Sequence, residues 1–209
     1  MKKLLSLVLA LLLALSFAGC SGSTAMTEKN VTATVDSAFD ALKRFDTKKL
    51  EKYVDSKTLS VIITYANKHD QFADLGKALF KNLEYNIESI DLAAKTVTVS
   101  VRNKDLKDTA SAFTKALVSK YSALQMLSLL NNETWLNTSL NSLTDSIAIA
   151  KMQSAPVSVT LTVTAGKKNL MLGFDDTAEN AVSGGALQAV KSLTSGLTGS
   201  KSTTESTSN

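Results

Sequence analysis

The chain has 209 residues, 44% of them hydrophobic, and a formal net charge of +4 at pH 7. This length allows one domain with a sizeable hydrophobic core. The single cysteine excludes an internal disulfide, a Cys-x-x-Cys redox pair and a zinc site built on cysteines. The basic residues form no stripe with interleaved aromatic side chains, so we expect no nucleic acid as a partner.

The first residues of the chain predict export. Lys2 and Lys3 give a positive start, and the stretch Leu4–Phe17 that follows contains no charged side chain. As a helix this stretch would span about 21 Å, which is short of the roughly 30 Å hydrocarbon core of a bilayer. It therefore predicts a removable signal peptide over residues 1–19 rather than a permanent membrane span.

The signal ends in a cysteine. Phe17, Ala18 and Gly19 precede Cys20, and this order resembles the lipobox of bacterial lipoproteins, in which Leu is commoner at the first position. The resemblance implies that Cys20 carries lipid, with acyl chains such as palmitate, and becomes the first residue of the mature protein. Two acyl chains, at about 0.8 kcal/mol per buried CH2, hold a protein on a membrane. We expect a lipid-anchored protein on the extracytoplasmic face of the cell membrane; ordinary secretion and an uncleaved anchor are the alternatives.

The mature chain divides into three parts by composition. Residues 20–30 are small and polar, which predicts a flexible tether. Residues 31–193 carry the periodic apolar patterns of a single domain. Residues 194–209 are mostly Ser, Thr and Gly, with too little apolar surface to offset the entropy cost of ordering, so we expect a disordered tail.

The domain begins with helical patterns. Apolar residues recur at helical spacing from Val31 to Phe45, and Asp46 is expected to cap a short helix that ends near Val54. Two more helices are predicted over residues 59–68 and 70–83.

Two β-hairpins are predicted further along the chain, since apolar residues alternate strictly with polar ones. The first covers residues 84–102, with a bulge or strand end near Ile90, and the second covers residues 157–174. Between them, residues 105–152 predict two antiparallel helices with Asn132 as the cap of the second. After the second hairpin, a short helix is expected to end at a glycine pair.

These elements predict an α+β fold in which N-terminal helices pack on a curved, four-stranded antiparallel sheet of two hairpins, with a helical-hairpin insert. The pattern over residues 31–190 resembles the nuclear transport factor 2-like or cystatin-like superfamily, and the insert departs from it. It is also similar to small lipoproteins of low-GC Gram-positive bacteria that have no assigned activity. The superfamily often provides a pocket, and its ketosteroid isomerase-like members use that pocket for catalysis.

Few residues are candidates for chemistry, and we expect no cofactor and no metal. His69 lies beside Asp70 as a carboxylate-oriented base would, although a His at a helix end looks the same. Trp135 could line a ligand pocket with Tyr53, Tyr65 or Tyr121, or could simply pack at a rim. The pair Asp175-Asp176 is read as a helix cap rather than a cation site, and no Gly-x-Ser-x-Gly motif indicates a serine hydrolase.

We therefore expect a non-catalytic domain that binds a small ligand or an envelope protein. Two other classes stay open. One is a structural role, in which the Thr-rich sheet face, including Thr98, Thr160 and Thr162, meets another protein or a second copy as a homodimer. The other is an isomerase-like enzyme that uses the pocket.

Overall fold

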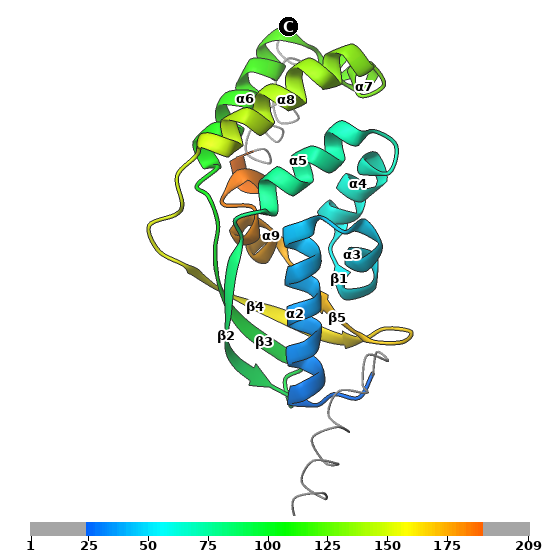
Figure 1. Cartoon of the computed structure of the whole chain (residues 1–209), viewed down its shortest axis with the longest axis vertical. Helices are drawn as coiled ribbons and strands as arrows, with labels where there is room; N and C mark the ends of the chain where they lie inside the picture. The colour runs from blue at the N-terminus through cyan, green and yellow to red at the C-terminus, as the bar shows by residue number, and fades with distance from the viewer. Residues whose placement is uncertain (1–23, 190–209) are drawn as a thin grey trace, which may run out of the picture.

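The computed structural model of the chain describes residues 24–189 (Figure 1). Within this range, helices from the N-terminal part cover one face of a sheet, and the 105–152 insert forms a separate group of helices beyond them. The predicted signal peptide, Cys20 and the 194–209 tail lie outside the described residues. The fold is α+β, as the sequence predicts.

The sheet has the strand order β1-β5-β4-β3-β2. Both predicted hairpins form, because β2 pairs antiparallel with β3, and β4 pairs antiparallel with β5. The sheet is nevertheless mixed and five-stranded, so the prediction of four antiparallel strands is wrong at one edge, where β1 runs parallel to β5. The strands are β1 (Val54–Asp55), β2 (Glu84–Asp91), β3 (Thr96–Arg102), β4 (Val157–Ala165) and β5 (Leu170–Gly173).

The alternation of side chains along the strands gives the sheet one buried face. Val97, Val99 and Leu161 are fully buried, whereas Thr160 and Thr162 on the opposite face of β4 are exposed. The pairing of β2 with β3 shifts register between residues 87 and 89, which confirms the irregularity expected near Ile90. The buried face is the one that receives the N-terminal helices.

The longest of these helices is α2 (Glu28–Arg44), which crosses the sheet (Figure 1). It begins inside the stretch predicted to be a tether, because the Thr27 side chain accepts a hydrogen bond from the Asn30 N–H and caps it. Its Phe39 ring stacks on Tyr85 of β2 at a centroid distance of 4.4 Å. Three further helices follow: α3 (Thr47–Tyr53), capped by Asp46 as predicted, α4 (Lys57–Ala66) and α5 (Asp70–Phe80).

The insert contains three helices rather than the predicted two: α6 (Lys107–Lys120), α7 (Ala123–Leu129) and α8 (Glu133–Ile149). The chain becomes extended at Tyr121, and a capping box between Ser122 and Gln125 then starts α7. Asn132 caps α8, as predicted. Helix α8 packs mainly along α5 and also contacts α6.

The last described helices follow β5. Asp175 caps α9 (Asp176–Val182), which confirms the interpretation of Asp175-Asp176 as a cap. Gly184 and Gly185 then have φ angles of 62° and 85°, a region that residues with a side chain rarely adopt. The predicted glycine stop is therefore confirmed, and one more helical turn over residues 186–189 follows it.

Gly184 is expected to be intolerant of a side chain. A Cβ atom at Gly184 would lie 1.8 Å from the backbone oxygen of Lys104, and the Gly184 carbonyl accepts a hydrogen bond from the Leu106 N–H at 2.8 Å. Because left-handed backbone alone costs about 1–2 kcal/mol, we expect Gly184→Ala to lower the free energy of unfolding by more than about 2 kcal/mol. Urea denaturation measures this change.

Gly185→Ala is the matched control for that substitution. Its φ is also positive, but the nearest atom to an added Cβ is the Lys107 Cβ at 3.3 Å. We expect the free energy of unfolding of this variant to fall by only the cost of the left-handed backbone, about 1–2 kcal/mol. Equal losses of unfolding free energy for the two variants would show that the clash with Lys104 does not destabilise Gly184→Ala.

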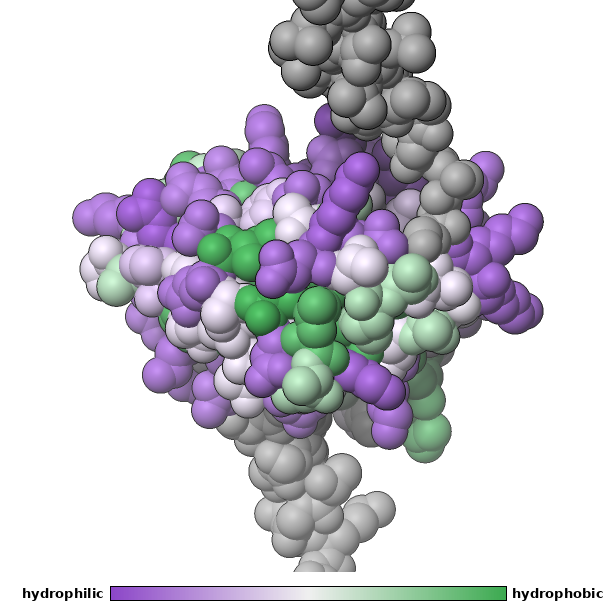
Figure 2. All heavy atoms as spheres, turned by 90° about the horizontal axis from the view of Figure 1, so that it is seen from below, coloured by the Kyte–Doolittle hydropathy of each residue, from purple (hydrophilic) through white to green (hydrophobic). Residues whose placement is uncertain are grey.

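The face seen from below in Figure 2 is mostly polar. Figure 2 shows the lower end of the molecule, where a small group of apolar side chains lies among hydrophilic ones. Of the helices within residues 24–189, none combines the length and apolar character needed to cross a bilayer.

Candidate ligand-binding site

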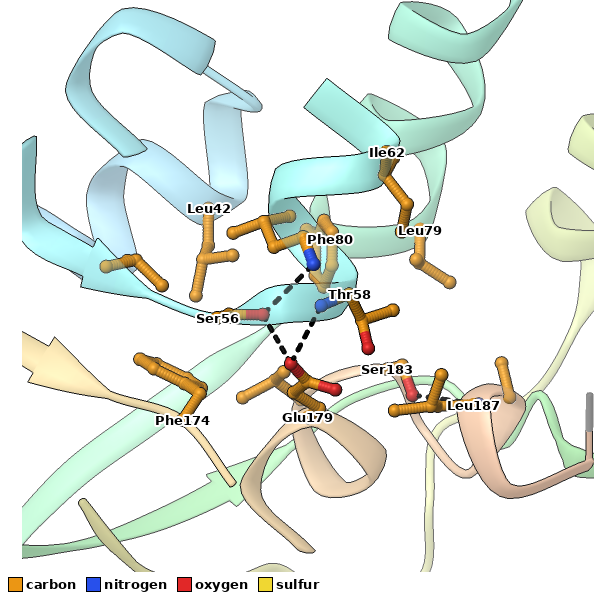
Figure 3. Close-up of a pocket in the computed structure, with 14 residues that line it drawn as sticks. Leu42, Ser56, Thr58, Ile62, Leu79, Phe80, Phe174, Glu179, Ser183 and Leu187 are labelled. Carbon is orange, nitrogen blue, oxygen red and sulfur yellow. Dashed lines mark hydrogen bonds between the residues drawn. The ribbon is translucent and has the colours of Figure 1, made fainter. Parts of the chain in front are cut away.

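A cavity of about 310 Å³ lies where the N-terminal helices meet α9 (Figure 3). Each of the surrounding elements contributes an apolar side chain to its wall. These include Leu42 of α2, Val54 of β1, Ile62 of α4, Phe80 of α5, Phe174 after β5, and Leu187. The volume and the apolar lining are typical of sites for small molecules.

Helix caps position the polar groups of the cavity. Ser56 precedes α4, and its Oγ accepts a hydrogen bond from the Leu59 N–H at 3.0 Å. Asp175 precedes α9, and its carboxylate accepts one from the Ala178 N–H at 2.8 Å. These two caps fix the starts of two helices that face each other across the cavity, and they bring Glu179 of α9 next to Ser56.

Glu179 is the acidic side chain in the wall of this cavity, and it is only 8% exposed. Its Oε1 accepts a hydrogen bond from the Ser56 hydroxyl and a longer one, at 3.4 Å, from the Thr58 N–H. Its Oε2 is buried and has no hydrogen-bond partner among the described residues. Figure 3 shows this second oxygen pointing away from Ser56, toward the space between Thr58 and Ser183.

The electrostatic setting of Glu179 is unusual for a buried carboxylate. None of the described residues that line the cavity is a lysine, an arginine or a histidine. Burying a charged group without a partner costs free energy, and buried carboxylates are normally paired. The wall of this mostly apolar cavity therefore contains one carboxylate, next to the hydroxyl residues Ser56, Thr58 and Ser183, and no cationic side chain among the described residues.

Asn103, which follows β3, joins two walls of the cavity. Its side chain is 1% exposed, and its Nδ2 donates to the Leu79 carbonyl at 2.9 Å and to the Val182 carbonyl at 2.7 Å. Leu79 at the end of α5 and Val182 at the end of α9 both line the cavity. The Asn103 Oδ1 accepts the Lys104 N–H at 2.8 Å, so the amide is held in one orientation.

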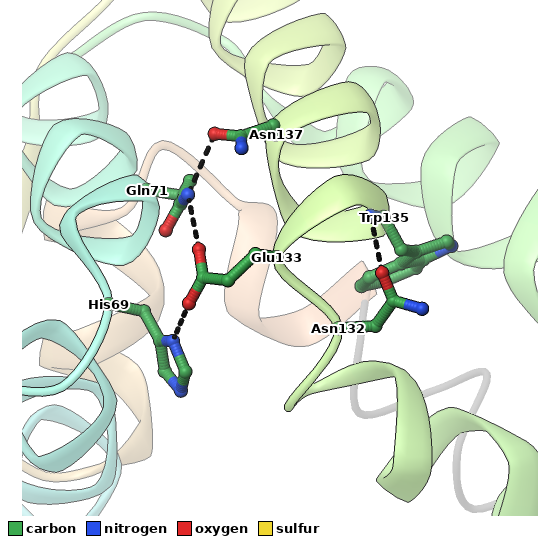
Figure 4. Close-up of polar contacts among 6 residues, drawn as sticks. All are labelled: His69, Gln71, Asn132, Glu133, Trp135 and Asn137. Carbon is green, nitrogen blue, oxygen red and sulfur yellow. Dashed lines mark hydrogen bonds and ion pairs between the residues drawn. The ribbon is translucent and has the colours of Figure 1, made fainter.

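His69, a predicted site residue, lies elsewhere, between α5 and α8 (Figure 4). Its Nδ1 is 2.8 Å from Glu133 Oε1, so the neighbouring carboxylate comes from α8 and not from the adjacent Asp70. Gln71 Nε2 donates to Glu133 Oε2 at 2.9 Å and to Asn137 Oδ1 at 2.7 Å. The hydrogen bonds from His69 and Gln71 lower the pKa of Glu133. This network fastens the insert to α5.

The predicted aromatic site residues are dispersed. Trp135 and Tyr121 come together edge to face, with centroids 6.3 Å apart. Tyr65 instead packs on Phe72, and Tyr53 is half-buried against the core. None of Trp135, Tyr53 and His69 lines the cavity. In the described part of the chain, no group of three or more His, Cys, Asp or Glu side chains is placed to hold a metal ion.

The residues that define the cavity were not singled out by the sequence. Glu179 lies on the buried side of α9, between Ala178 and Ala181, and this acidic residue on an apolar helix face is the one available signal. Ser56 is separated from Glu179 by 123 positions, so no local pattern links them. Asn103 carries no signal at all, because an asparagine at the end of a strand is normally exposed.

Comparison with known proteins leaves the family of this chain open. No protein-family model matches the chain, and none of the curated proteins matches it. Among solved structures, it is similar to the crystal structure of a candidate lipoprotein, YcdA, from Bacillus subtilis, with 15% identity and a TM-score of 0.34. The match covers 75% of this chain and 58% of that one, so the chain spans less than two thirds of this neighbour's length.

Proposed function

We propose that the protein is a lipid-anchored, extracytoplasmic binding protein for a small apolar ligand, without catalytic activity. The observation that carries the binding role is the largely apolar cavity whose wall holds the buried Glu179, one carboxylate oxygen of which has no hydrogen-bond partner among the described residues. The lipobox-like order that ends at Cys20 supports the anchor. The N-terminal helices on one face of a largely antiparallel sheet support the likeness to nuclear transport factor 2-like domains.

An isomerase-like enzyme is the second candidate, because a carboxylate in an apolar pocket can remove a proton next to a carbonyl group. That reaction also needs hydrogen-bond donors for the oxygen that becomes negative. The Ser56 hydroxyl donates to Glu179, and the Ser183 hydroxyl donates to the Asn180 carbonyl at 3.0 Å. Two of the three hydroxyl groups in the wall are committed in this way, and only that of Thr58 is left, so binding is the function that the described residues support better.

Filling the cavity tests the binding role. Ala186 lies at its wall and is half-buried, so Ala186→Trp should place an indole ring in the cavity without removing a core side chain. With 1-octanol as the probe, we expect the wild-type protein to gain about 2.7 kcal/mol of unfolding free energy at 100 times the Kd. The variant should gain none, as measured by chemical denaturation with and without the alcohol.

Ala94→Trp is the control for this experiment. Ala94 is exposed in the turn between β2 and β3, far along the chain from every residue of the cavity wall. This variant should respond to 1-octanol as the wild type does. Stabilisation of Ala186→Trp to the same extent would mean that the alcohol binds somewhere else, and the proposed role of the cavity would be wrong.

A further inference from the structure

We infer that the ligand is an apolar molecule carrying one amine group, and that its ammonium binds Oε2 of Glu179 inside the cavity. This inference rests on the proposed binding function and names the chemical class of the ligand. Three properties of the site lead to it: the hydrogen bonds of the carboxylate, its charge, and the size of the cavity.

The hydrogen bonds of Glu179 divide its two oxygens into different roles. Oε1 is held by the Ser56 hydroxyl and the Thr58 N–H, whereas Oε2 is buried without a partner among residues 24–189. A carboxylate oxygen only accepts hydrogen bonds, so a ligand group that pairs with Oε2 must be a hydrogen-bond donor. Ligands whose polar end is a carboxylate, a phosphate or a sulfate therefore do not fit.

The negative charge of the Glu179 carboxylate favours a positively charged donor on the ligand over a neutral one. Among residues 24–189, the lining of the cavity supplies no lysine, arginine or histidine to neutralise the carboxylate. A hydroxyl group would complete the hydrogen bond but leave the charge unpaired, whereas an ammonium group does both. The Ser183 hydroxyl already donates to Asn180 and accepts the Leu187 N–H at 3.2 Å, so it does not compete for the ammonium.

The size of the cavity limits the apolar part. At about 30 Å³ for each water-sized group, 310 Å³ holds about ten non-hydrogen atoms. Most of the wall is apolar, with Ile62, Leu79 and Phe80 grouped on one side in Figure 3. A straight chain of about eight carbons, or one aromatic ring with a short linker, fills such a space.

Calorimetric titration with four probes of equal chain length tests the inference on the full mature protein. The probes are n-octylamine, 1-octanol, octanoate and N-octylacetamide, which keeps the nitrogen but carries no charge. We expect the wild type to bind n-octylamine at least about tenfold more tightly than 1-octanol or N-octylacetamide, because hydrogen bonds between charged groups are the stronger ones. Octanoate should bind more weakly than any of the others.

Two variants refine the test. Glu179→Gln keeps the shape of the side chain and removes its charge, so the preference for n-octylamine over 1-octanol should disappear while 1-octanol still binds. Glu51→Gln makes the same change at an exposed position of α3 and should keep the preference. If Glu179→Gln fails to fold, the comparison of n-octylamine with 1-octanol on the wild type decides the question alone, because these two probes have the same number of non-hydrogen atoms.

The outcomes separate the two proposals. Equal affinities for n-octylamine, 1-octanol and N-octylacetamide on the wild type would overturn the amine inference and leave the binding function standing. Binding of none of the probes, with Ala186→Trp behaving as the wild type, would overturn the binding function itself. A preference for n-octylamine that survives in Glu179→Gln would place the amine at another carboxylate and also overturn the inference.

Discussion

Replacement of Asn103 by aspartate is expected to lower the free energy of unfolding by about 3–5 kcal/mol. The substitution keeps the shape of the side chain, but it replaces the Nδ2 donor with an oxygen that would face the carbonyls of Leu79 and Val182. Two buried carbonyls would lose their donor, and a carboxylate would be buried at 1% exposure beside them. Chemical denaturation monitored by far-UV circular dichroism measures the loss.

The same substitution should also weaken the binding of 1-octanol, because Leu79 and Val182 line the cavity. Asn103→Ala removes the donor without adding a charge, so we expect a smaller loss of about 2 kcal/mol. Asn86→Asp, at an exposed position of β2, serves as the matched control and should change stability by less than about 0.5 kcal/mol. An Asn103→Asp protein as stable as this control would contradict the role assigned to the amide.

Replacement of Cys20 by serine is expected to remove the protein from the membrane fraction altogether. The sequence order ending at Cys20 resembles a lipobox, and lipid attachment there requires the thiol. Two acyl chains bind a bilayer strongly, and the serine variant has no thiol to carry them. Cell fractionation, with mass spectrometry of the mature N-terminus, measures both the location and the acyl modification.

Ser23→Ala is the control for this experiment, since Ser23 lies outside the lipobox-like positions. It should remain in the membrane fraction and keep the acyl mass. The lipoprotein assignment would be refuted by a Cys20→Ser protein that stays membrane-bound, or by a wild-type protein that retains Met1 and carries no lipid.

Sequence patterns predicted most of the helices and strands, because residue spacing and capping side chains act over a few neighbouring residues. Strict alternation of apolar and polar residues identified both hairpins, and side chains such as Asp46, Asn132 and Asp175 marked helix starts. Strand β1 was missed because two residues are too few to show a period. Helix α7 was missed because the apolar stripe of α6 continues past Tyr121, where the backbone is in fact extended.

The candidate site could not be predicted in the same way, because it depends on contacts between distant parts of the chain. Ser56 meets Glu179, and Asn103 meets Leu79 and Val182, only in the folded structure. The sequence predicts a carboxylate near His69 and points to the adjacent Asp70. In the structure the carboxylate beside His69 is that of Glu133 in α8. Residue types indicated which chemistry was available, and the tertiary fold selected which groups meet.

The direction of α2 has a consequence for where such a protein would collect its ligand. Leu42, in the wall of the cavity, lies fourteen residues along the helix from Glu28, which is about 20 Å at 1.5 Å per residue. The end of α2 that leads back toward Cys20 is the one farther from Leu42. With lipid at Cys20, most of the length of α2 would separate the cavity from the anchored end of the domain, so a ligand would bind away from the point of attachment.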